Sequence, residues 1–203
     1  NYEHTPLMVD GLLYMRSDAG PVMALDPQTG KVLWTDKQAA TGGGKSRGIS
    51  YWSDGKDARI FALDGSDLVA VNAKTGERYR DFGNGGRVDL NVYADSLPNA
   101  PVENYSWSSF PVVVRDVVVL AGVPRVAEKK VPEGTQPALD PPGDIRGYDV
   151  RTGKLLWTFH VVPRKGEFGY DTWKKGSAEL NGLAGAWTWL TGDDELGYIY
   201  IPT

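Results

Sequence analysis

The sequence predicts an all-β protein, a β-propeller assembled from four-stranded antiparallel units. A short phrase occurs as ALDPQTGKVLW at 24–34 and as GYDVRTGKLLW at 147–157, with a looser copy, AVNAKTGERY, at 70–79. The 203 residues include 25 Gly, 13 Pro and 7 Trp, which is typical of short strands, many turns and regularly placed aromatic anchors. No stretch shows apolar residues recurring at the helical period.

Each copy of the phrase predicts a β-hairpin. In the first copy one apolar run ends at Asp26 and a second ends at Trp34. Pro27 presets φ at the start of a tight turn, and Gly30 can adopt the positive φ that closes it. The side chains of Asp26 and Thr29 can hydrogen-bond the turn backbone. The second strand of the hairpin therefore carries the tryptophan.

The spacing of the copies fits a propeller. The turn threonines Thr29, Thr75 and Thr152 are 46 and 77 residues apart. The first interval matches a blade period of about 40–50 residues. The second is longer because residues 124–144, rich in proline and charge, form an insertion.

Paired strands complete the units. Residues 6–15 (PLMVDGLLYM) and 111–120 (PVVVRDVVVL) each predict two strands joined at an aspartate, which together with a following hairpin make a four-stranded sheet. Residues 58–76 give the middle of another unit, and residues 187–203 open a fourth. We expect a single partial propeller domain over residues 1–203, with three blades and the start of a fourth.

The aromatic residue of each phrase is expected to join neighbouring blades. Trp34 and Trp157 should be mostly buried at blade junctions, with each indole N–H donating to a backbone acceptor. Tyr79 stands at this position in the second copy, so a somewhat weaker junction is expected there.

Composition excludes several functions. With 22 Lys+Arg and 26 Asp+Glu, the net charge of −4 indicates no general attraction to nucleic acid. The absence of cysteine excludes disulfides and thiolate metal sites, and the two histidines, His4 and His160, disfavour a multi-histidine centre. The Gly-rich run at 42–46 is not a phosphate loop, because Ala39 replaces the required glycine and strand-like residues follow.

The repeats resemble the tryptophan-docking repeats of the pyrroloquinoline quinone (PQQ) dehydrogenases, eight-bladed propellers that include methanol, alcohol and membrane-type glucose dehydrogenases. More specific similarities occur, in the order expected for the enzymes, in EHTPLMVDGLLY, SRGISYW, WSSFPVVV, GDIRGYDVRTGKLLWTFH, GEFGYDTW and AWTWLTGDDELGYIYIPT. The resemblance covers nearly the whole chain, which corresponds to about half of such a ring.

The resemblance implies four cofactor-binding residues. Arg47 matches the arginine that the family directs at a PQQ carboxylate, a contact that suits the bidentate guanidinium. Ser108 matches a hydroxyl used on another carboxylate, with Ser109 as the alternative if the register slips by one. Trp187 matches the floor under the quinone ring, and Glu3 matches an acidic residue that touches the cofactor in some relatives.

Two positions depart from the family pattern. GGGKS stands where the methanol-oxidising relatives have adjacent cysteines, so that vicinal disulfide cannot form. The family holds Ca²⁺ with a carboxylate soon after the strand VVVLAG, but here VPRV follows. The nearest acid is Glu128, Asp140 is a weaker candidate, and no metal ligand is assigned. Trp189 is expected to be a core tryptophan at a blade edge.

The resemblance implies a dehydrogenase, dependent on PQQ and Ca²⁺, that oxidises an alcohol, polyol or aldose. Electrons would pass to the respiratory chain through a quinone or cytochrome c. The location would be periplasmic, with inner-membrane association left open for a longer form. The catalytic base and remaining metal ligands would lie beyond Thr203. We therefore expect residues 1–203 alone to be inactive and to need further blades or another chain to close the ring.

The alternative is a non-catalytic propeller that serves as a scaffold or binding protein and has lost the cofactor. The presence of Arg47, Ser108 and Trp187 favours the enzyme, because docking repeats require none of them. The absence of an assigned metal carboxylate favours the scaffold.

Overall fold

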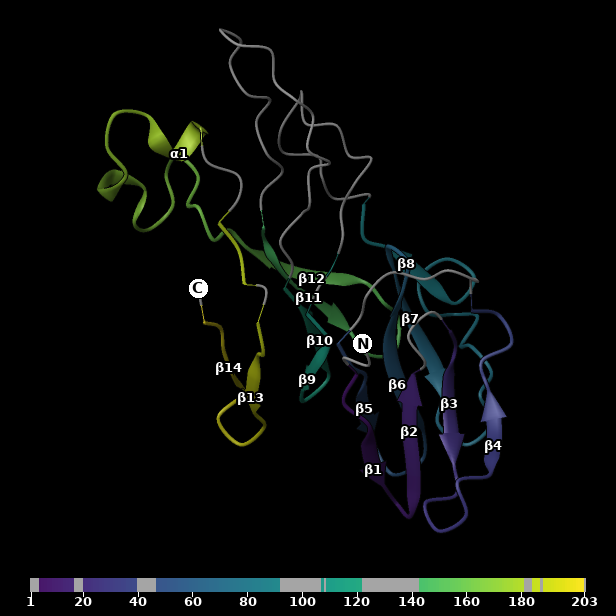
Figure 1. Cartoon of the computed structure of the whole chain (residues 1–203). Coiled ribbons are helices and arrows are strands. Elements are labelled where there is room, and N and C mark those ends of the chain that lie inside the picture. The colour runs from purple at the N-terminus through teal and green to yellow at the C-terminus, as the bar shows by residue number, and fades with distance from the viewer. Residues whose placement is uncertain are drawn as a thin grey trace, which may run out of the picture.

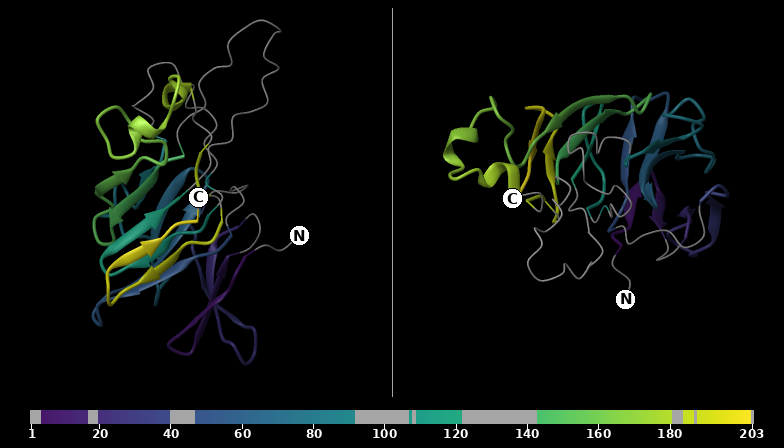
Figure 2. Two further views of the ribbon diagram at one scale, coloured as in Figure 1. Left: turned by 90° about the vertical axis from the view of Figure 1, so that its left-hand side faces the viewer. Right: turned by 90° about the horizontal axis from the view of Figure 1, so that it is seen from above.

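The computed structural model contains three four-stranded antiparallel sheets and one two-stranded sheet (Figure 1). Seen from above, the sheets follow one another in chain order along an arc (Figure 2, right). The all-β propeller prediction is confirmed. The structure describes the following residues: 4–16, 20–39, 47–91, 107, 109–121, 143–180, 184–186 and 188–202.

The strands of each sheet are hydrogen-bonded in chain order. The first sheet holds β1 (Leu7–Val9), β2 (Leu12–Arg16), β3 (Val22–Leu25) and β4 (Val32–Thr35). The second holds β5 (Ser50–Ser53), β6 (Ala58–Asp64), β7 (Asp67–Asn72) and β8 (Arg87–Asp89). The third holds β9 (Val112–Val114), β10 (Val117–Leu120), β11 (Ile145–Asp149) and β12 (Leu155–Phe159). The last pairs β13 (Thr191–Asp193) with β14 (Tyr198–Tyr200).

Helical structure in the described residues is limited to two short pieces between β12 and β13. These are the 3₁₀ turn η2 (Tyr170–Thr172) and the helix α1 (Ser177–Leu180). Both lie in a segment that projects away from the sheets (Figure 1).

The first strand of each sheet lies at the inner edge of the arc. A parallel bridge between Thr5 and Gly48 joins the chain before β1 to the chain before β5. Strand β9 lies beside both β5 and β13. We call the end at which β1, β5, β9 and β13 begin the entry end. Because neighbouring strands are antiparallel, β10 and β12 finish at this same end, and β11 starts there.

The core consists of three apolar layers, each between neighbouring sheets. Tyr14 and Ile60 belong to the layer between the first and second sheets. Phe61 and Tyr148 belong to the layer between the second and third. Strand β6 is therefore buried along its whole length, since its two faces meet different neighbours.

The turn of each repeated phrase forms as the sequence predicts. The Asp26 carboxylate accepts hydrogen bonds from the backbone N–H groups of Gln28 (2.8 Å) and Thr29 (2.9 Å). Gly30 adopts φ = +70° and its N–H donates to the Asp26 carbonyl at 2.8 Å. The other two copies repeat this arrangement from Asn72 and Asp149.

Trp34 joins the first sheet to the second. Its indole N–H donates to the carbonyl of Ala73 at 3.1 Å. Its ring covers Gly76, where an added Cβ would lie 2.6 Å from the ring. Beside this contact, the buried Arg78 guanidinium binds Asp36 at 2.8 Å and Asp64 at 2.6 Å. Half-buried Trp34 and the ion pairs together form the first junction.

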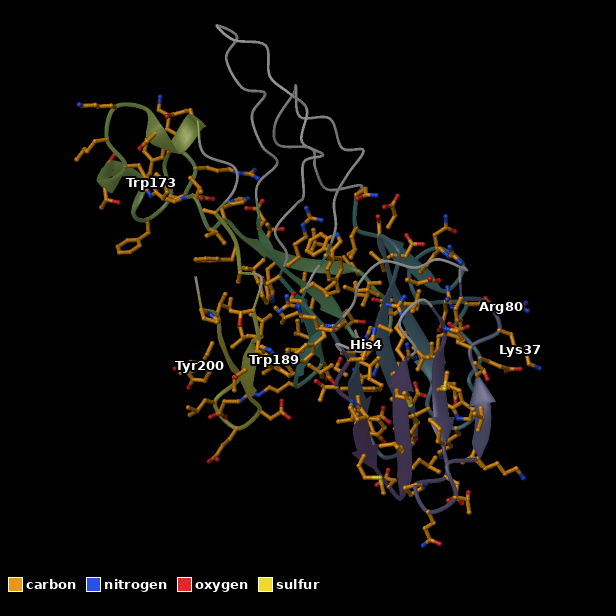
Figure 3. All side chains as sticks on the ribbon, viewed as in Figure 1. His4, Lys37, Arg80, Trp173, Trp189 and Tyr200 are labelled. Atoms are coloured by element: carbon orange, nitrogen blue, oxygen red, sulfur yellow. The ribbon has the colours of Figure 1, made fainter. Side chains whose placement is uncertain are left out.

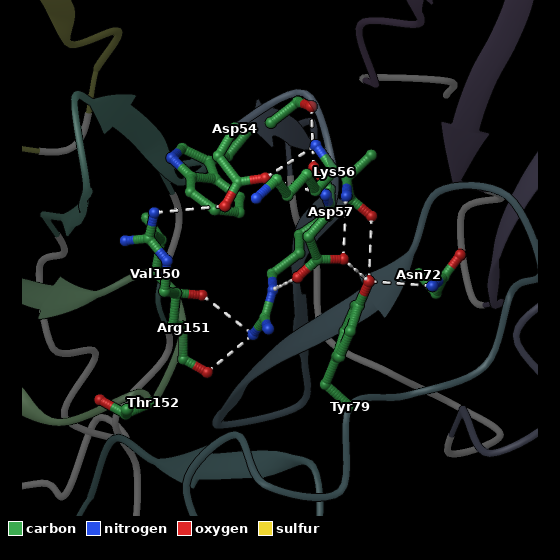
Figure 4. Close-up of polar contacts among 12 residues, drawn as sticks. Asp54, Lys56, Asp57, Asn72, Tyr79, Val150, Arg151 and Thr152 are labelled. Carbon is green, nitrogen blue, oxygen red and sulfur yellow. Dashed lines mark hydrogen bonds and ion pairs between the residues drawn. The ribbon is translucent and has the colours of Figure 1, made fainter.

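The second junction uses an arginine in place of the indole. Val150 holds the position in the third copy that Ala73 holds in the second. Its carbonyl accepts a hydrogen bond from Arg59 Nη1 at 3.2 Å, and the next carbonyl, of Arg151, accepts another at 2.7 Å. The guanidinium lies 3.8 Å above the ring of Tyr79, and this ring faces Asp57 within its own sheet (Figure 4). Tyr79 thus orients the donor that replaces tryptophan.

The prediction that Trp157 is mostly buried is wrong. Its side chain is 36% exposed and covers Gly147 across the same sheet, where an added Cβ would lie 2.2 Å from the indole. Trp157 lies on β12 at one edge of the third sheet, whereas β13 contacts that sheet at β9, its opposite edge. That junction is instead made by Arg115, which donates to the backbone carbonyls of Asp194 (2.9 Å) and Glu195 (2.5 Å).

Gly76→Ala should destabilise the protein more than Gly30→Ala, although both glycines hold the same place in the phrase. Each substitution incurs a positive-φ cost of about 1–2 kcal/mol, but nothing lies within 4 Å of a Cβ at Gly30. At Gly76 the clash with Trp34 adds about 1–3 kcal/mol. Urea unfolding measures both, and equal losses would show that the indole does not dock on this turn.

Arg59→Met should lower the free energy of unfolding by about 2–3 kcal/mol, because two carbonyls lose a charged donor. Arg87→Met is the control, since Arg87 forms an exposed ion pair with Asp67 at 3.0 Å and should lose under about 1 kcal/mol. Equal midpoints for the two variants in urea unfolding would contradict the role given to Arg59.

Candidate functional site

The four cofactor-binding residues expected from the sequence share one position in the chain, three or four residues before the first strand of a sheet. Glu3, Ser108 and Trp187 each stand four residues before the first strand of a sheet, and Arg47 stands three residues before one. Arg47 is described by the structure, whereas Glu3, Ser108 and Trp187 lie outside the described residues. Their neighbours in the chain nevertheless show how the four strand entries are arranged.

The entries of β1 and β5 are in direct contact. The Thr5 N–H donates to the Arg47 carbonyl at 3.1 Å, beside the parallel bridge to Gly48. His4, which follows Glu3, is buried. The Arg47 side chain is half-buried, so a cation lies at the entry end with part of its surface accessible.

Aromatic contacts continue this series around the inner edge. A Cβ at Gly48 would lie 3.4 Å from Phe110 Cγ, so the Phe110 ring rests against the entry of β5. Phe110 meets Trp189 edge-to-face, with ring centroids 5.1 Å apart and planes at 74°. Phe110 is two residues after Ser108, and Trp189 is two after Trp187. Contacts therefore connect all four strand entries.

The prediction that Trp189 is a core tryptophan is wrong. Its side chain is 51% exposed (Figure 3). Phe110 packs against one edge of the ring. The indole is therefore an accessible aromatic surface near the entry of β13.

Ser109, the alternative to Ser108, has another role in the structure. The residue is buried, and its hydroxyl donates to the carbonyl of Ala121 at the end of β10. A serine hydroxyl has one proton to donate. Since that proton is directed at Ala121, Ser109 does not offer a donor to a carboxylate.

Arg146, a residue outside the four expected from the sequence, supports the entry of β9. The residue is 1% exposed, and its Nη1 donates to the Leu90 carbonyl at 2.7 Å. Its guanidinium carbon lies 5.2 Å from the ring centroid of Trp107, the residue before Ser108. An arginine next to Ile145, in a strand that precedes a repeated turn, was the available signal, because buried charges are retained only when they are paired.

The described residues contain no group of three or more His, Cys, Asp or Glu side chains that could hold a metal ion. Glu128 and Asp140, the acids nearest the expected Ca²⁺ position, lie outside the described ranges. Among the helices that the structure describes, none combines the length and apolar character needed to cross a membrane.

The cation and the aromatic rings described at the entry end suit a flat organic anion. Arg47 supplies a cation, and Trp189 with Phe110 supplies aromatic surface. These are the partners that a planar carboxylate-bearing ring requires. The described residues thus fit the cofactor expected from the sequence, whereas they provide no carboxylate set for its metal.

Comparison with known proteins identifies the family. The family model described as "PQQ: Glucose/ethanol/alcohol dehydrogenase, beta-propeller domain" matches residues 1–203. The match spans the whole chain, so the chain belongs to this family of quinoprotein β-propellers.

Individual relatives agree with the family match. The glycerol dehydrogenase large subunit of Gluconobacter oxydans is 33% identical, over 99% of this chain and 27% of the relative. Quinoprotein glucose dehydrogenase A of Acinetobacter calcoaceticus is 31% identical, over 98% of this chain and 26% of the relative. The chain therefore spans about a quarter of the length of these curated relatives.

A solved structure gives the same result. Quinohemoprotein alcohol dehydrogenase ADHIIG from Pseudomonas putida HK5 superposes with a TM-score of 0.67 at 25% identity. The superposition covers 98% of this chain and 28% of that protein.

Proposed function

We propose that this chain forms part of a PQQ-dependent dehydrogenase that oxidises an alcohol, a polyol or an aldose. The observation that carries the proposal is the contact series joining four strand entries, each preceded by a residue suited to PQQ. A single flat anion near the inner edge can reach several blades at once only where their entries meet.

Each residue has a distinct part in this proposal. Arg47 forms a bidentate, charge-assisted contact with one carboxylate. Ser108 donates its hydroxyl to a second carboxylate, since Ser109 is directed at Ala121. Trp187 stacks beneath the ring, and Glu3 contacts the cofactor from the first blade. PQQ, when bound, supplies the two-electron acceptor that no side chain provides.

The finer parts of the proposal concern the metal, the acceptor and the location. We propose Ca²⁺ as the metal, and no residue of this chain is assigned as its ligand. Electrons would pass to the respiratory chain through a quinone or cytochrome c, in the periplasm. These assignments are supported by the resemblance of the sequence motifs to the quinoprotein dehydrogenases.

The proposal is tested by adding PQQ and Ca²⁺ to the complete protein that carries this sequence. A panel of alcohols, polyols and aldoses is then screened for reduction of an artificial dye. We expect reduction that depends on PQQ and falls when the metal is chelated. If PQQ neither binds nor supports dye reduction, the chain belongs to a scaffold propeller that has kept the repeats alone.

Arg47→Ala should raise the dissociation constant for PQQ by about 10- to 100-fold, because a charge-assisted hydrogen-bond pair is lost. Arg47→Lys keeps the charge without the bidentate geometry and should give a smaller increase. Arg80→Ala is the control, because Arg80 is exposed at a distance from the entry of β5 (Figure 3). Calorimetric titration measures all three. Equal affinities in the wild type and Arg47→Ala would remove Arg47 from the site.

A further inference from the structure

A lobe of residues 160–180 leaves the third sheet at the end of β12 and precedes the entry of β13. It contains η2 and α1 and stands beyond the sheets at the entry end (Figures 1 and 2). Its base packs on the core through Val161, which lies against the layer containing Ala186. The chain that follows the lobe leads directly to Trp187.

The lobe and the chain that follows it both contact the dipeptide Gly143–Asp144, which precedes β11. After the lobe, Gly185 forms a parallel bridge with Gly143. Gly185 is two residues before Trp187. The backbone at Gly143 therefore fixes the segment that carries the expected floor of the cofactor site.

The start of the lobe is attached through the Asp144 side chain. Asp144 is 4% exposed, although it carries a carboxylate. Arg164 Nη2 lies 3.4 Å from Asp144 Oδ2, and His160 Nε2 lies 3.9 Å from the same oxygen. Both partners belong to the lobe.

Glu167, which also belongs to the lobe, contacts both lobe residues that face Asp144. Its carboxylate lies 2.7 Å from His160 Nδ1 and accepts the backbone N–H of Arg164 at 2.7 Å. Glu167 thereby orients both residues that face Asp144. We call these four residues, Asp144, His160, Arg164 and Glu167, the Asp144 cluster.

The surroundings of Asp144 explain why it depends on the lobe. Burial raises the pKa of Asp144, whereas His160, Arg164 and Arg146 lower it, and Glu167 raises it. A buried carboxylate without cations is strongly unfavourable. Two of the three groups that lower this pKa, Arg164 and His160, come from the lobe, so displacing the lobe would remove most of the polar partners of the buried carboxylate.

We propose that Asp144 is a positioning residue that fixes the lobe and thereby the segment bearing Trp187. Asp144 holds the lobe through Arg164 and His160, and Gly143 holds Gly185. The lobe and the segment that follows it are therefore both fixed to the start of β11. The effect on the cofactor floor rests on the proposed function. The attachment of the lobe does not, and the two are measured separately.

The test uses Asp144→Asn in the complete protein, with Asp149→Asn as the matched control. Asp149 lies at the other end of the same strand, where it binds the turn N–H groups of Arg151 (3.0 Å) and Thr152 (2.7 Å). The control therefore weakens the same sheet without touching the lobe. Arg164→Gln is a second variant, because the Arg164 side chain is 45% exposed and its loss should leave the sheets folded.

Hydrogen exchange tests the attachment without any cofactor. We expect amides of residues 160–180 and 184–186 to exchange about tenfold faster in Asp144→Asn and Arg164→Gln, and not in Asp149→Asn. Unchanged exchange in both lobe variants would overturn the proposal.

The affinity for PQQ and the absorption spectrum of the bound cofactor test the floor. We expect Asp144→Asn to weaken PQQ binding about tenfold and to change the spectrum, at a melting temperature no lower than that of Asp149→Asn. Faster exchange in the lobe with unchanged affinity and spectrum would overturn the link to Trp187. A wild-type protein that binds no PQQ would refute the proposed function and that link, while hydrogen exchange would still decide the attachment.

Discussion

The arrangement of the first three blades depends on the backbone carbonyl of the second residue in the Thr-Gly turns of the second and third copies, Ala73 and Val150. Ala73 and Val150 present this carbonyl toward the preceding sheet, and each must receive a donor because a buried carbonyl without one is costly. Trp34 supplies it at one junction and Arg59 at the next. The acceptor is thus constant while the donor varies, which allows Tyr79 to replace a tryptophan without loss of the hydrogen bond.

This constant spacing of blades determines where the candidate site lies. Once neighbouring sheets are held in register, their inner strands begin at one end and their entries touch. Thr5 contacts Arg47, and Phe110 lies between Gly48 and Trp189. Residues separated by more than 180 positions in the chain are thereby brought to one edge. The site is a consequence of how blades pack, and no single blade could form it.

Buried charge reinforces the same arrangement. Arg78 with two aspartates lies between the first and second sheets, Arg146 lies between the second and third, and Asp144 faces the lobe. Each of these residues pairs with a group from a neighbouring sheet or from the lobe. A buried charge needs a polar partner, and that partner comes from the element that covers the charge. These charged residues therefore help to fix the position of each blade relative to the next element.

The sequence by itself determined the strands, the turns and the blade period, because these depend on local spacing of apolar residues, aspartate and glycine. It also placed Arg47 before an inner strand. Only the tertiary structure decided where each aromatic ring packs: Trp34 lies on Gly76 of the next sheet, Trp157 on Gly147 of its own sheet, and Trp189 against Phe110. It likewise directed Ser109 to Ala121 and gathered the Asp144 cluster, because hydrogen-bond partners distant in sequence meet only after the sheets have packed.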